Sequence, residues 1–157
     1  HAAGRLPTAG LGLPPRPMAA ALAALPGPGA VIDLPVQRDP ARHLRYQTGQ
    51  LVHERPILFH HVADFLDDGA GRALVLEDST LRWFVQVSLS GSPPEAPETD
   101  ALRSLRTKDA FRFVVVHPQG WERRARRDAA LAALRDRLGP PMLETSDGRI
   151  AWELPDR

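Results

Sequence analysis

The chain of 157 residues contains no cysteine. Disulfide bonds, thiol catalysis and cysteine-based zinc or iron–sulfur sites are therefore excluded. Long apolar runs are missing as well. The longest covers residues 18–25, whereas a membrane-spanning helix needs roughly 20 apolar residues. Neither of the glycine-rich phosphate loops, GxGxxG and GxxxxGK[ST], occurs, and no serine lies in a GxSxG context. Nucleotide binding through such loops and serine hydrolysis thus have no support.

The charges are nearly balanced, with 20 Lys and Arg against 19 Asp and Glu. Together with a hydrophobic fraction of 43%, this composition is typical of an ordinary globular domain. It gives no indication of a nucleic-acid partner, and we expect none. The chain begins HAAGRLP, without an initiator Met or a signal peptide, so we expect a segment cut from a larger protein.

Proline and glycine divide the chain into two parts. Residues 1–28 hold six prolines and only one short stretch with helix propensity, at residues 18–25. We therefore predict an extended leader or linker over residues 1–28, lying on the surface of a single α/β domain over residues 29–157. The sequence predicts no cofactor for either part.

The first half of the domain has the pattern of a βαβ unit. Residues 30–36 are a β-branched run that suits a buried parallel strand, with Pro35 at its end. Asp39 and Pro40 then form a helix start, and apolar residues at helical spacing continue to about Val52. Residues 56–62 read as the second strand.

The second half continues the alternation. The segment ALVLEDSTLRWFVQVSL (73–89) has a potential cap at Asp78 or Ser79 and fits an amphipathic helix, although the alternation from Trp83 to Leu89 also fits a strand; we favour the helix. Further elements are predicted as a helix at 101–107, a strand at 111–117, a helix at 121–138 and a hairpin turning at Asp147-Gly148. The predicted fold is an α/β three-layer sandwich with a mainly parallel sheet and a C-terminal β-hairpin.

Several short motifs, taken in order, resemble a known family. They are the VIDLPV strand, then Gln50-x-x-His53-x-Arg55-Pro56-Ile57, then FRFVVVH at 111–117, and finally Leu138-Gly139-x-Pro141 with a closing hairpin. This order resembles the C-terminal extracytoplasmic domain of bacterial multi-spanning membrane proteins of the mannosyltransferase-like (GT-C) glycosyltransferase type. In that pattern glycine is usual where this chain has Glu54, and small residues are usual where it has Phe59-His60-His61.

The resemblance implies a setting. The catalytic acid of such a transferase would belong to a loop between membrane helices, outside this chain. The chain itself would then be a non-catalytic accessory domain on the extracytoplasmic face of a bacterial membrane. Its partners would be the membrane-embedded part of the parent chain, with lipid headgroups or a lipid-linked sugar as further candidates. Fold-level likeness of this kind indicates a setting and no mechanism.

Within the resembling stretch, His53, Arg55 and Asp33 are the candidate ligand-binding residues. Arg55 has the fork geometry that recognises a phosphate or another anion. The alternative is structural: His53 caps the preceding helix, and Asp33 is satisfied by backbone N–H groups or an arginine. A sugar- or phosphate-binding module is thus one hypothesis for the domain.

The histidines suggest a different class of function. Parallel strands end at one edge of a sheet, so His117 and either His60 or His61 can converge there, with Asp33 and Asp64 as metal or proton partners. A small α/β enzyme or metal-binding module using His53, His60 and His117 is therefore a second hypothesis. No metal-ligand spacing such as HExxH accompanies these residues, so separate histidines remain the plain alternative.

A dense basic segment follows Trp121. It comprises Arg123, Arg124, Arg126 and Arg127. Two interpretations stay open: a solvated helix face, or contact with anionic lipid headgroups.

Overall fold

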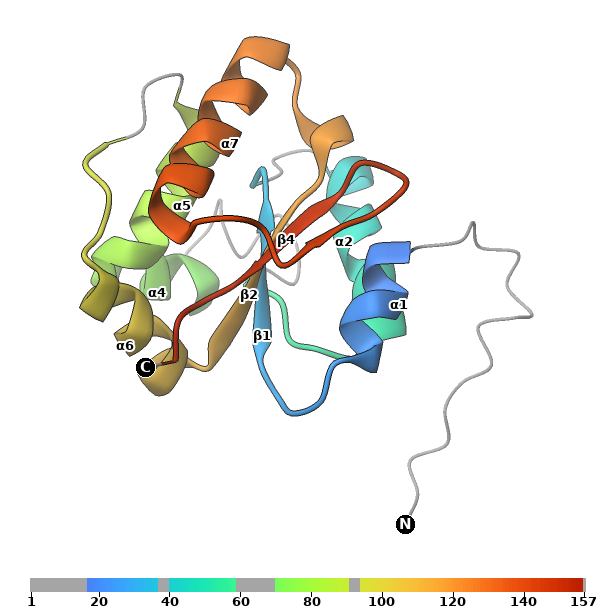
Figure 1. Ribbon diagram of the computed structural model, residues 1–157, viewed down its shortest axis with the longest axis horizontal. Coiled ribbons are helices and arrows are strands. Elements are labelled where there is room, and N and C mark those ends of the chain that lie inside the picture. The colour runs from blue at the N-terminus through green and yellow to red at the C-terminus, as the bar shows by residue number, and fades with distance from the viewer. Residues whose placement is uncertain (1–16, 37–39, 59–69, 91–93, 157) are drawn as a thin grey trace.

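The computed structural model describes residues 17–36, 40–58, 70–90 and 94–156. Figure 1 shows the elements of this part of the chain: α1 (Pro17–Ala24), β1 (Ala30–Leu34), α2 (Pro40–His53), α4 (Ala70–Glu77), α5 (Ser79–Leu89), α6 (Thr99–Asp109), β2 (Phe111–Val116), η2 (Pro118–Gly120), α7 (Arg124–Leu138), β3 (Leu143–Glu144) and β4 (Ile150–Glu153). The fold is α/β, as predicted. None of the helices in these ranges is long and apolar enough to cross a membrane.

The four strands form one mixed sheet in the order β1-β2-β4-β3. Only β1 and β2 are parallel, whereas β4 runs antiparallel to both β2 and β3. The prediction of a mainly parallel sheet is therefore wrong. After α7 the chain enters β3, which runs in the same direction as β2, as a parallel sheet would require. However, β3 does not pair with β2. The second strand of the hairpin, β4, lies between them and pairs antiparallel with both.

The predicted second strand of the βαβ unit is present only in part. Ile57 forms an isolated parallel bridge with Val31 on the free edge of β1. Two backbone hydrogen bonds hold it there: Val31 donates to Pro56 over 2.8 Å, and Leu58 donates to Val31 over 3.0 Å. The direction of this segment agrees with a βαβ unit, while residues 59–62 of the predicted strand lie outside the described residues.

Helices cover both faces of the sheet, which gives the domain its three layers (Figure 1). Side chains alternate along β2, so that Val114 and Val116 face α5, α6 and α7, whereas Phe113 and Val115 face α1 and α2. The first cluster is the larger and is centred on Trp152, Phe84 and Leu134. Both clusters consist largely of side chains that have almost no exposed surface.

Local signals account for the helices of the larger cluster. Asp78 caps α5, because its carboxylate accepts hydrogen bonds from the backbone N–H groups of Thr80 and Leu81 at 2.7 and 3.0 Å. The helical interpretation of residues 79–89 is thereby confirmed. The helix predicted from Trp121 begins instead at Arg124, since Pro118–Gly120 form a separate 3-10 turn.

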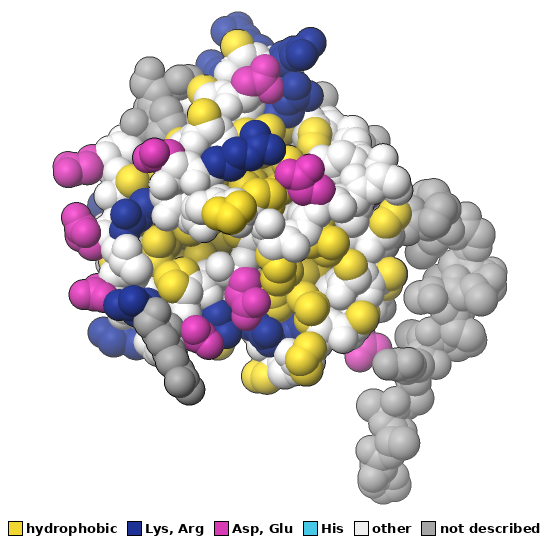
Figure 2. All heavy atoms as spheres, in the orientation of Figure 1, with side chains coloured by type: hydrophobic (Ala, Val, Ile, Leu, Met, Phe, Trp, Pro, Cys, Tyr) yellow, Lys and Arg dark blue, Asp and Glu magenta, His cyan; other side chains and the backbone are white. Residues whose placement is uncertain are grey.

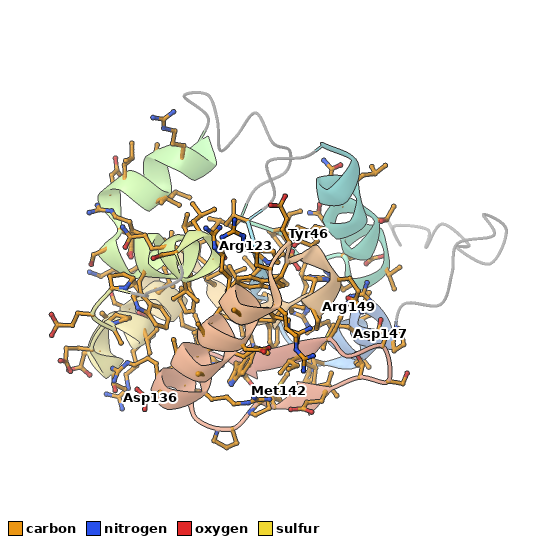
Figure 3. The ribbon with its side chains drawn as sticks, turned by 90° about the horizontal axis from the view of Figure 1, so that it is seen from above. Tyr46, Arg123, Asp136, Met142, Asp147 and Arg149 are labelled. Carbon is orange, nitrogen blue, oxygen red and sulfur yellow. The ribbon has the colours of Figure 1, made fainter. Side chains whose placement is uncertain are left out.

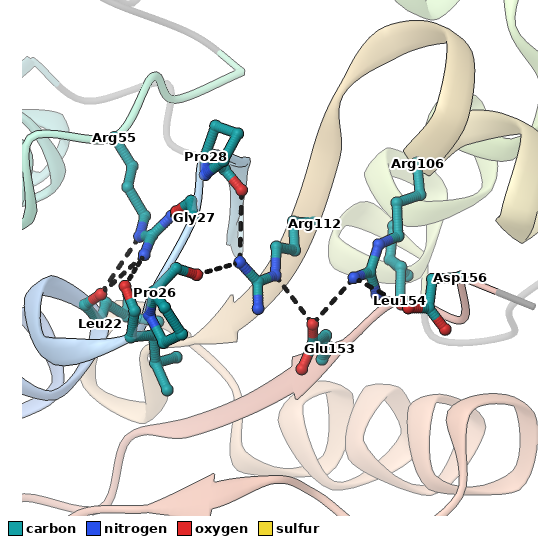
Figure 4. Close-up of polar contacts among 11 residues, drawn as sticks. Leu22, Pro26, Gly27, Pro28, Arg55, Arg106, Arg112, Glu153, Leu154 and Asp156 are labelled. Atoms are coloured by element: carbon teal, nitrogen blue, oxygen red, sulfur yellow. Dashed lines mark hydrogen bonds and ion pairs between the residues drawn. The ribbon is translucent and has the colours of Figure 1, made fainter.

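Residues 17–28 do not form the predicted extended surface leader. They contain α1, whose Met18 and Leu22 are 2% and 1% exposed and pack into the second cluster. The loop after α1 is held by Arg112, which donates to the carbonyl oxygens of Pro26 at 2.6 Å and Pro28 at 3.4 Å (Figure 4). Residues 1–16 of the predicted leader lie outside the described part of the chain.

A polar cluster continues from this loop across the sheet (Figure 4). The Nε of Arg112 donates to Glu153 at 2.8 Å, and Arg106 on α6 lies 3.1 Å from the same carboxylate oxygen. Arg106 also donates to the carbonyl of Leu154. These contacts join α1, β2, β4 and α6, so residues 17–28 are an integral part of the packed domain.

Gly29 offers a test of this close packing. Its φ is +149°, and an added Cβ would overlap Cβ of Arg112 and lie 2.8 Å from Cδ. We expect Gly29→Ala to lower the free energy of unfolding by about 1–3 kcal/mol in urea titrations, because both backbone strain and overpacking oppose it.

Gly49 in α2 is the matched control, since an added Cβ there has no atom within 4 Å. Gly49→Ala should raise the free energy of unfolding by about 0.5–1 kcal/mol through helix propensity. Equal effects of the two substitutions would contradict the packing described for the loop.

Candidate functional site

A pocket lies between the α1–α2 layer and the carboxyl ends of the parallel strands β1 and β2. The pocket is small: its enclosed space has room for about one water molecule, and the wider empty space of about 330 Å³ around its lining includes open solvent. Edges of this kind are where α/β folds commonly bind ligands. The residues that line it are Met18, Ala19, Leu22, Asp33, Tyr46, Gly49, His53, Val115, His117 and Arg149.

The register of the sheet explains why three polar side chains meet here. Asp33 pairs with Val115 on β2, and Val115 pairs with Ala151 on β4. Successive residues of a strand point to opposite faces. His117 follows Val115 by two residues and Arg149 precedes Ala151 by two, so both share the face that carries Asp33.

The three side chains form a continuous hydrogen-bonded chain. Nε2 of His117 lies 2.6 Å from Oδ1 of Asp33, and Nε of Arg149 donates to Nδ1 of His117 at 3.0 Å. Because Arg149 can only donate, Nδ1 must be the acceptor, and the proton of His117 belongs on Nε2. Both ring nitrogens are thus engaged, and His117 keeps no free lone pair for proton abstraction.

Neighbours on both sides hold this arrangement in place. The guanidinium of Arg149 also pairs with Asp147, whose other oxygen accepts a hydrogen bond from Thr145 at 2.5 Å. Burial raises the pKa of Asp147, but the bond from Thr145 and the charge of Arg149 outweigh it and leave the pKa below its usual value. Figure 3 shows Asp147 and Arg149 on the hairpin.

Tyr46 closes the pocket from α2. Its ring centroid lies 4.4 Å from that of His117, with the planes tilted by 36°. Its hydroxyl donates to the carbonyl of Pro35 at 2.7 Å. Tyr46 therefore fixes α2 against the end of β1 and limits the movement of the histidine ring.

His53, the last residue of α2, is 8% exposed and lines the same pocket. Its Nδ1 accepts the backbone N–H of Arg55 at 3.0 Å, so the neutral ring carries its proton on Nε2. Burial lowers the pKa of His53, with Arg55 and His117 acting in the same direction and Asp33 opposing them. His53 therefore contributes a neutral ring with an N–H donor to the lining of the pocket.

Asp33 has one unused acceptor. Its side chain is 10% exposed, and Oδ2 is buried without a hydrogen-bond partner in the described part of the chain. Buried polar atoms are nearly always paired in proteins, and an unpaired one calls for an explanation. Asp33 and His117 lie together at the strand ends, as predicted. Oδ2 of Asp33 takes no part in this contact.

Arg55, the third candidate ligand-binding residue, does not line this pocket. It is 6% exposed and donates to the carbonyl oxygens of Leu22, Leu25 and Gly27 over 2.8–3.2 Å (Figure 4). Its guanidinium also lies 4.8 Å from the ring centroid of Phe113. Arg55 thus caps the carboxyl end of α1, where a cation is favourable.

The residues of the metal hypothesis are only partly described. No group of three His, Asp or Glu side chains with metal-binding geometry occurs in the ranges that the structure describes. His53 and His117 share the pocket, but His60, His61 and Asp64 lie outside those ranges, and the side chain of His43 is likewise not described.

Two polar residues of the pocket are not predicted as site residues from the sequence. Arg149 follows the Asp-Gly turn, where the pattern indicates only a hairpin, and Tyr46 lies where the pattern indicates only a helix. Alternation along β4 could have identified Arg149, because buried Ile150 and Trp152 point to one face and Arg149 must then point to the other.

The basic segment lies at the start of α7, at the top of the face in Figure 2. The side chain of Arg124 is 85% exposed and lies 3.6 Å from Asp128, which also pairs with Arg127 at 2.9 Å. Arg123 and Arg126 are exposed too. The segment is a solvated helix end, and the helix that it begins packs on the face of the sheet opposite to the pocket.

Comparisons of the chain with protein-family models, with curated proteins and with solved structures found no match.

The lowered pKa of His53 has a consequence for stability. Between the folded-state pKa and the ordinary value of 6.5, the unfolded chain binds a proton that the folded chain does not. His53 therefore makes the free energy of unfolding fall as the pH drops below about 6.5, by at most about 1.4 kcal/mol for each pH unit.

His53→Asn should reduce this dependence, because the Asn oxygen can still accept the N–H of Arg55 but has no proton to bind. Urea titrations at pH 7.5 and pH 5.5 of both proteins measure the difference. An unchanged slope in the variant would mean that His53 titrates normally in the folded domain.

Proposed function

We propose that this chain is a non-catalytic accessory domain on the extracytoplasmic face of a bacterial membrane. In this proposal it belongs to a larger polytopic protein of the glycosyltransferase type, whose membrane-embedded part is its partner and carries the chemistry. The residue order from VIDLPV to the closing hairpin is the basis for the setting. The engagement of both His117 nitrogens is the observation that supports a non-catalytic role.

The conformation of Glu54 supports the resemblance independently. Glycine is usual at this position of the pattern, and Glu54 has a φ of +57°. Only glycine adopts this region without a steric penalty. A backbone that favours glycine at this point thus occurs where the pattern expects it, directly after α2 and before Arg55.

The polar residues of the resembling stretch also support a structural use of the pattern. Arg55 donates its hydrogen bonds to carbonyl groups at the end of α1, and His53 accepts a hydrogen bond from the backbone of Arg55. These contacts stabilise the fold, so they explain both side chains without a catalytic role. Among the described histidine rings, His117 is held between Asp33 and Arg149, which removes the free nitrogen that general base catalysis requires.

The basic segment fits the same setting. Arg123, Arg124 and Arg126 are exposed at one end of α7, and exposed arginines close to a membrane attract anionic headgroups, by about 1 kcal/mol for each residue. Asp128 offsets part of this charge, so we expect the segment to orient the domain at the surface and not to anchor it alone.

The test is the location of the natural gene product in its own bacterium. An antibody against this domain should detect it in the membrane fraction after carbonate extraction, and protease added to intact spheroplasts should remove the signal. A cytoplasmic marker protein must survive the same treatment. Recovery of the domain as a free cytoplasmic protein would overturn the proposal.

A further inference from the structure

We propose that the contact between His53 and Arg55 is an acid-sensitive latch, which holds α1 on the domain while the ring of His53 is neutral and releases it when the ring becomes charged. This inference goes beyond the proposed function and does not depend on where the chain is located. It rests on three parts of the structure that touch one another: the end of α2, the side chain of Arg55 and the carboxyl end of α1.

The turn after α2 is held by a hydrogen bond that only a neutral ring can accept. Nδ1 of His53 accepts the backbone N–H of Arg55 at 3.0 Å. Between them, Glu54 has a φ of +57°, a region that carries a steric penalty for residues other than glycine, and its N–H donates to the carbonyl of Gln50 at 2.7 Å. The bond to His53 therefore stabilises a turn that is unfavourable without it.

Arg55 connects this turn to α1. Its guanidinium donates four hydrogen bonds to the carbonyl oxygens of Leu22, Leu25 and Gly27 (Figure 4). The helix α1 has only eight residues, and helices this short are not stable by themselves in water. Its attachment to the domain depends on the packing of its buried side chains and on these bonds, so it depends on where the backbone of Arg55 directs the guanidinium.

A second proton on His53 removes the acceptor. Both nitrogens of a charged imidazole are donors, so an N–H at Nδ1 would point at the backbone N–H of Arg55. The ring is 8% exposed, and a charged ring in this place would also lose much of its hydration. The charged ring must turn away, which releases the turn at Glu54 and moves the guanidinium of Arg55 from the end of α1.

The surroundings of His53 keep the closed latch neutral. Burial disfavours the charged ring most, the charges of Arg55 and His117 add to this effect, and Asp33 on β1 opposes it. The net result is a pKa of His53 below its ordinary value. Arg149 lines the same pocket from the hairpin, and α1 itself carries no charged side chain.

The sign of the pH dependence follows from this difference. With the latch open, the ring has its ordinary pKa of about 6.5, and with the latch closed the pKa is lower. The open form thus binds the proton more readily, and opening becomes more favourable as the pH falls through 6.5. Between pH 7.5 and pH 5.5 the equilibrium constant for opening should rise several-fold, by at most about tenfold.

The experiment is amide hydrogen exchange of the whole chain, followed by NMR at pH 7.5 and pH 5.5 and corrected for the intrinsic exchange rates. Amides of residues 21–24, in the second turn of α1, should lose protection at the lower pH by several-fold, up to about tenfold. Amides of β2 should be better protected than these at both pH values, by about tenfold or more, because they exchange through global unfolding. Equal protection of α1 and β2, or protection of α1 that does not change with pH, would overturn the latch.

The ring of His53 provides a second measurement on the parent chain, which needs no variant. Long-range ¹H–¹⁵N correlation should show a neutral ring with its proton on Nε2 at pH 7.5, and a titration midpoint below 6.5. A midpoint at or above 6.5 would mean that the closed form does not resist the second proton, and it would overturn the proposal.

Two variants test the two steps separately. His53→Asn keeps an acceptor for the N–H of Arg55 and cannot titrate, so the protection of α1 should be the same at both pH values. Arg55→Lys keeps the charge and the backbone N–H but loses the fork of donors, so α1 should be less protected at both pH values. A pH dependence like that of the parent chain in His53→Asn, or unchanged protection of α1 in Arg55→Lys, would contradict the corresponding step.

Asp136→Asn is the matched control. Asp136 is an exposed carboxylate on α7, remote from the pocket residue Arg149 (Figure 3). This variant should keep the pH dependence of the parent chain in α1. Loss of the dependence in this control would show that it arises from the overall charge of the domain and would overturn the role of His53.

Discussion

The position of His117 between Asp33 and Arg149 is the interaction on which the pocket depends. It links the ends of β1 and β2 with the hairpin before β4, and it couples a parallel pair of strands to an antiparallel one. The same geometry limits what the pocket can do chemically. An imidazole with both nitrogens engaged orients its neighbours and transfers no proton. The groups that remain available in the pocket are Oδ2 of Asp33 and the Nε2–H of His53.

Arginine contributes most of the remaining polar structure. Arg55 closes the end of α1, and Arg112 holds the following loop against β2 and Glu153. Each guanidinium carries five donors in a fixed fork, so one side chain satisfies several carbonyl groups that a loop rich in proline cannot pair by itself. Without these contacts α1 would lose its place over the sheet, and the pocket would lose one wall.

Much of the fold was predictable from local signals. The cap at Asp78, the strand before His117 and the Asp147-Gly148 turn each specify an element within a few residues. The mainly antiparallel pairing of the strands was not predictable in this way. It depends on β4 pairing with β2, and the residues of these two strands are distant in the sequence. The role of residues 17–28 was missed for a similar reason, since their partners Arg55 and Arg112 lie far along the chain. In the pocket, Asp33 and His117 followed from the rule that parallel strands end together, while Arg149 required the register.

The tautomer of His117 tests this account most directly. Long-range ¹H–¹⁵N correlation of its ring at pH 7.5, assigned by comparison with a His117→Gln variant, reports which nitrogen carries the proton. The account predicts a neutral ring protonated on Nε2, with Nδ1 as acceptor from Arg149. A ring protonated on Nδ1, or one that exchanges freely between the two forms, would contradict the hydrogen-bonded chain and return His117 to the candidates for catalysis.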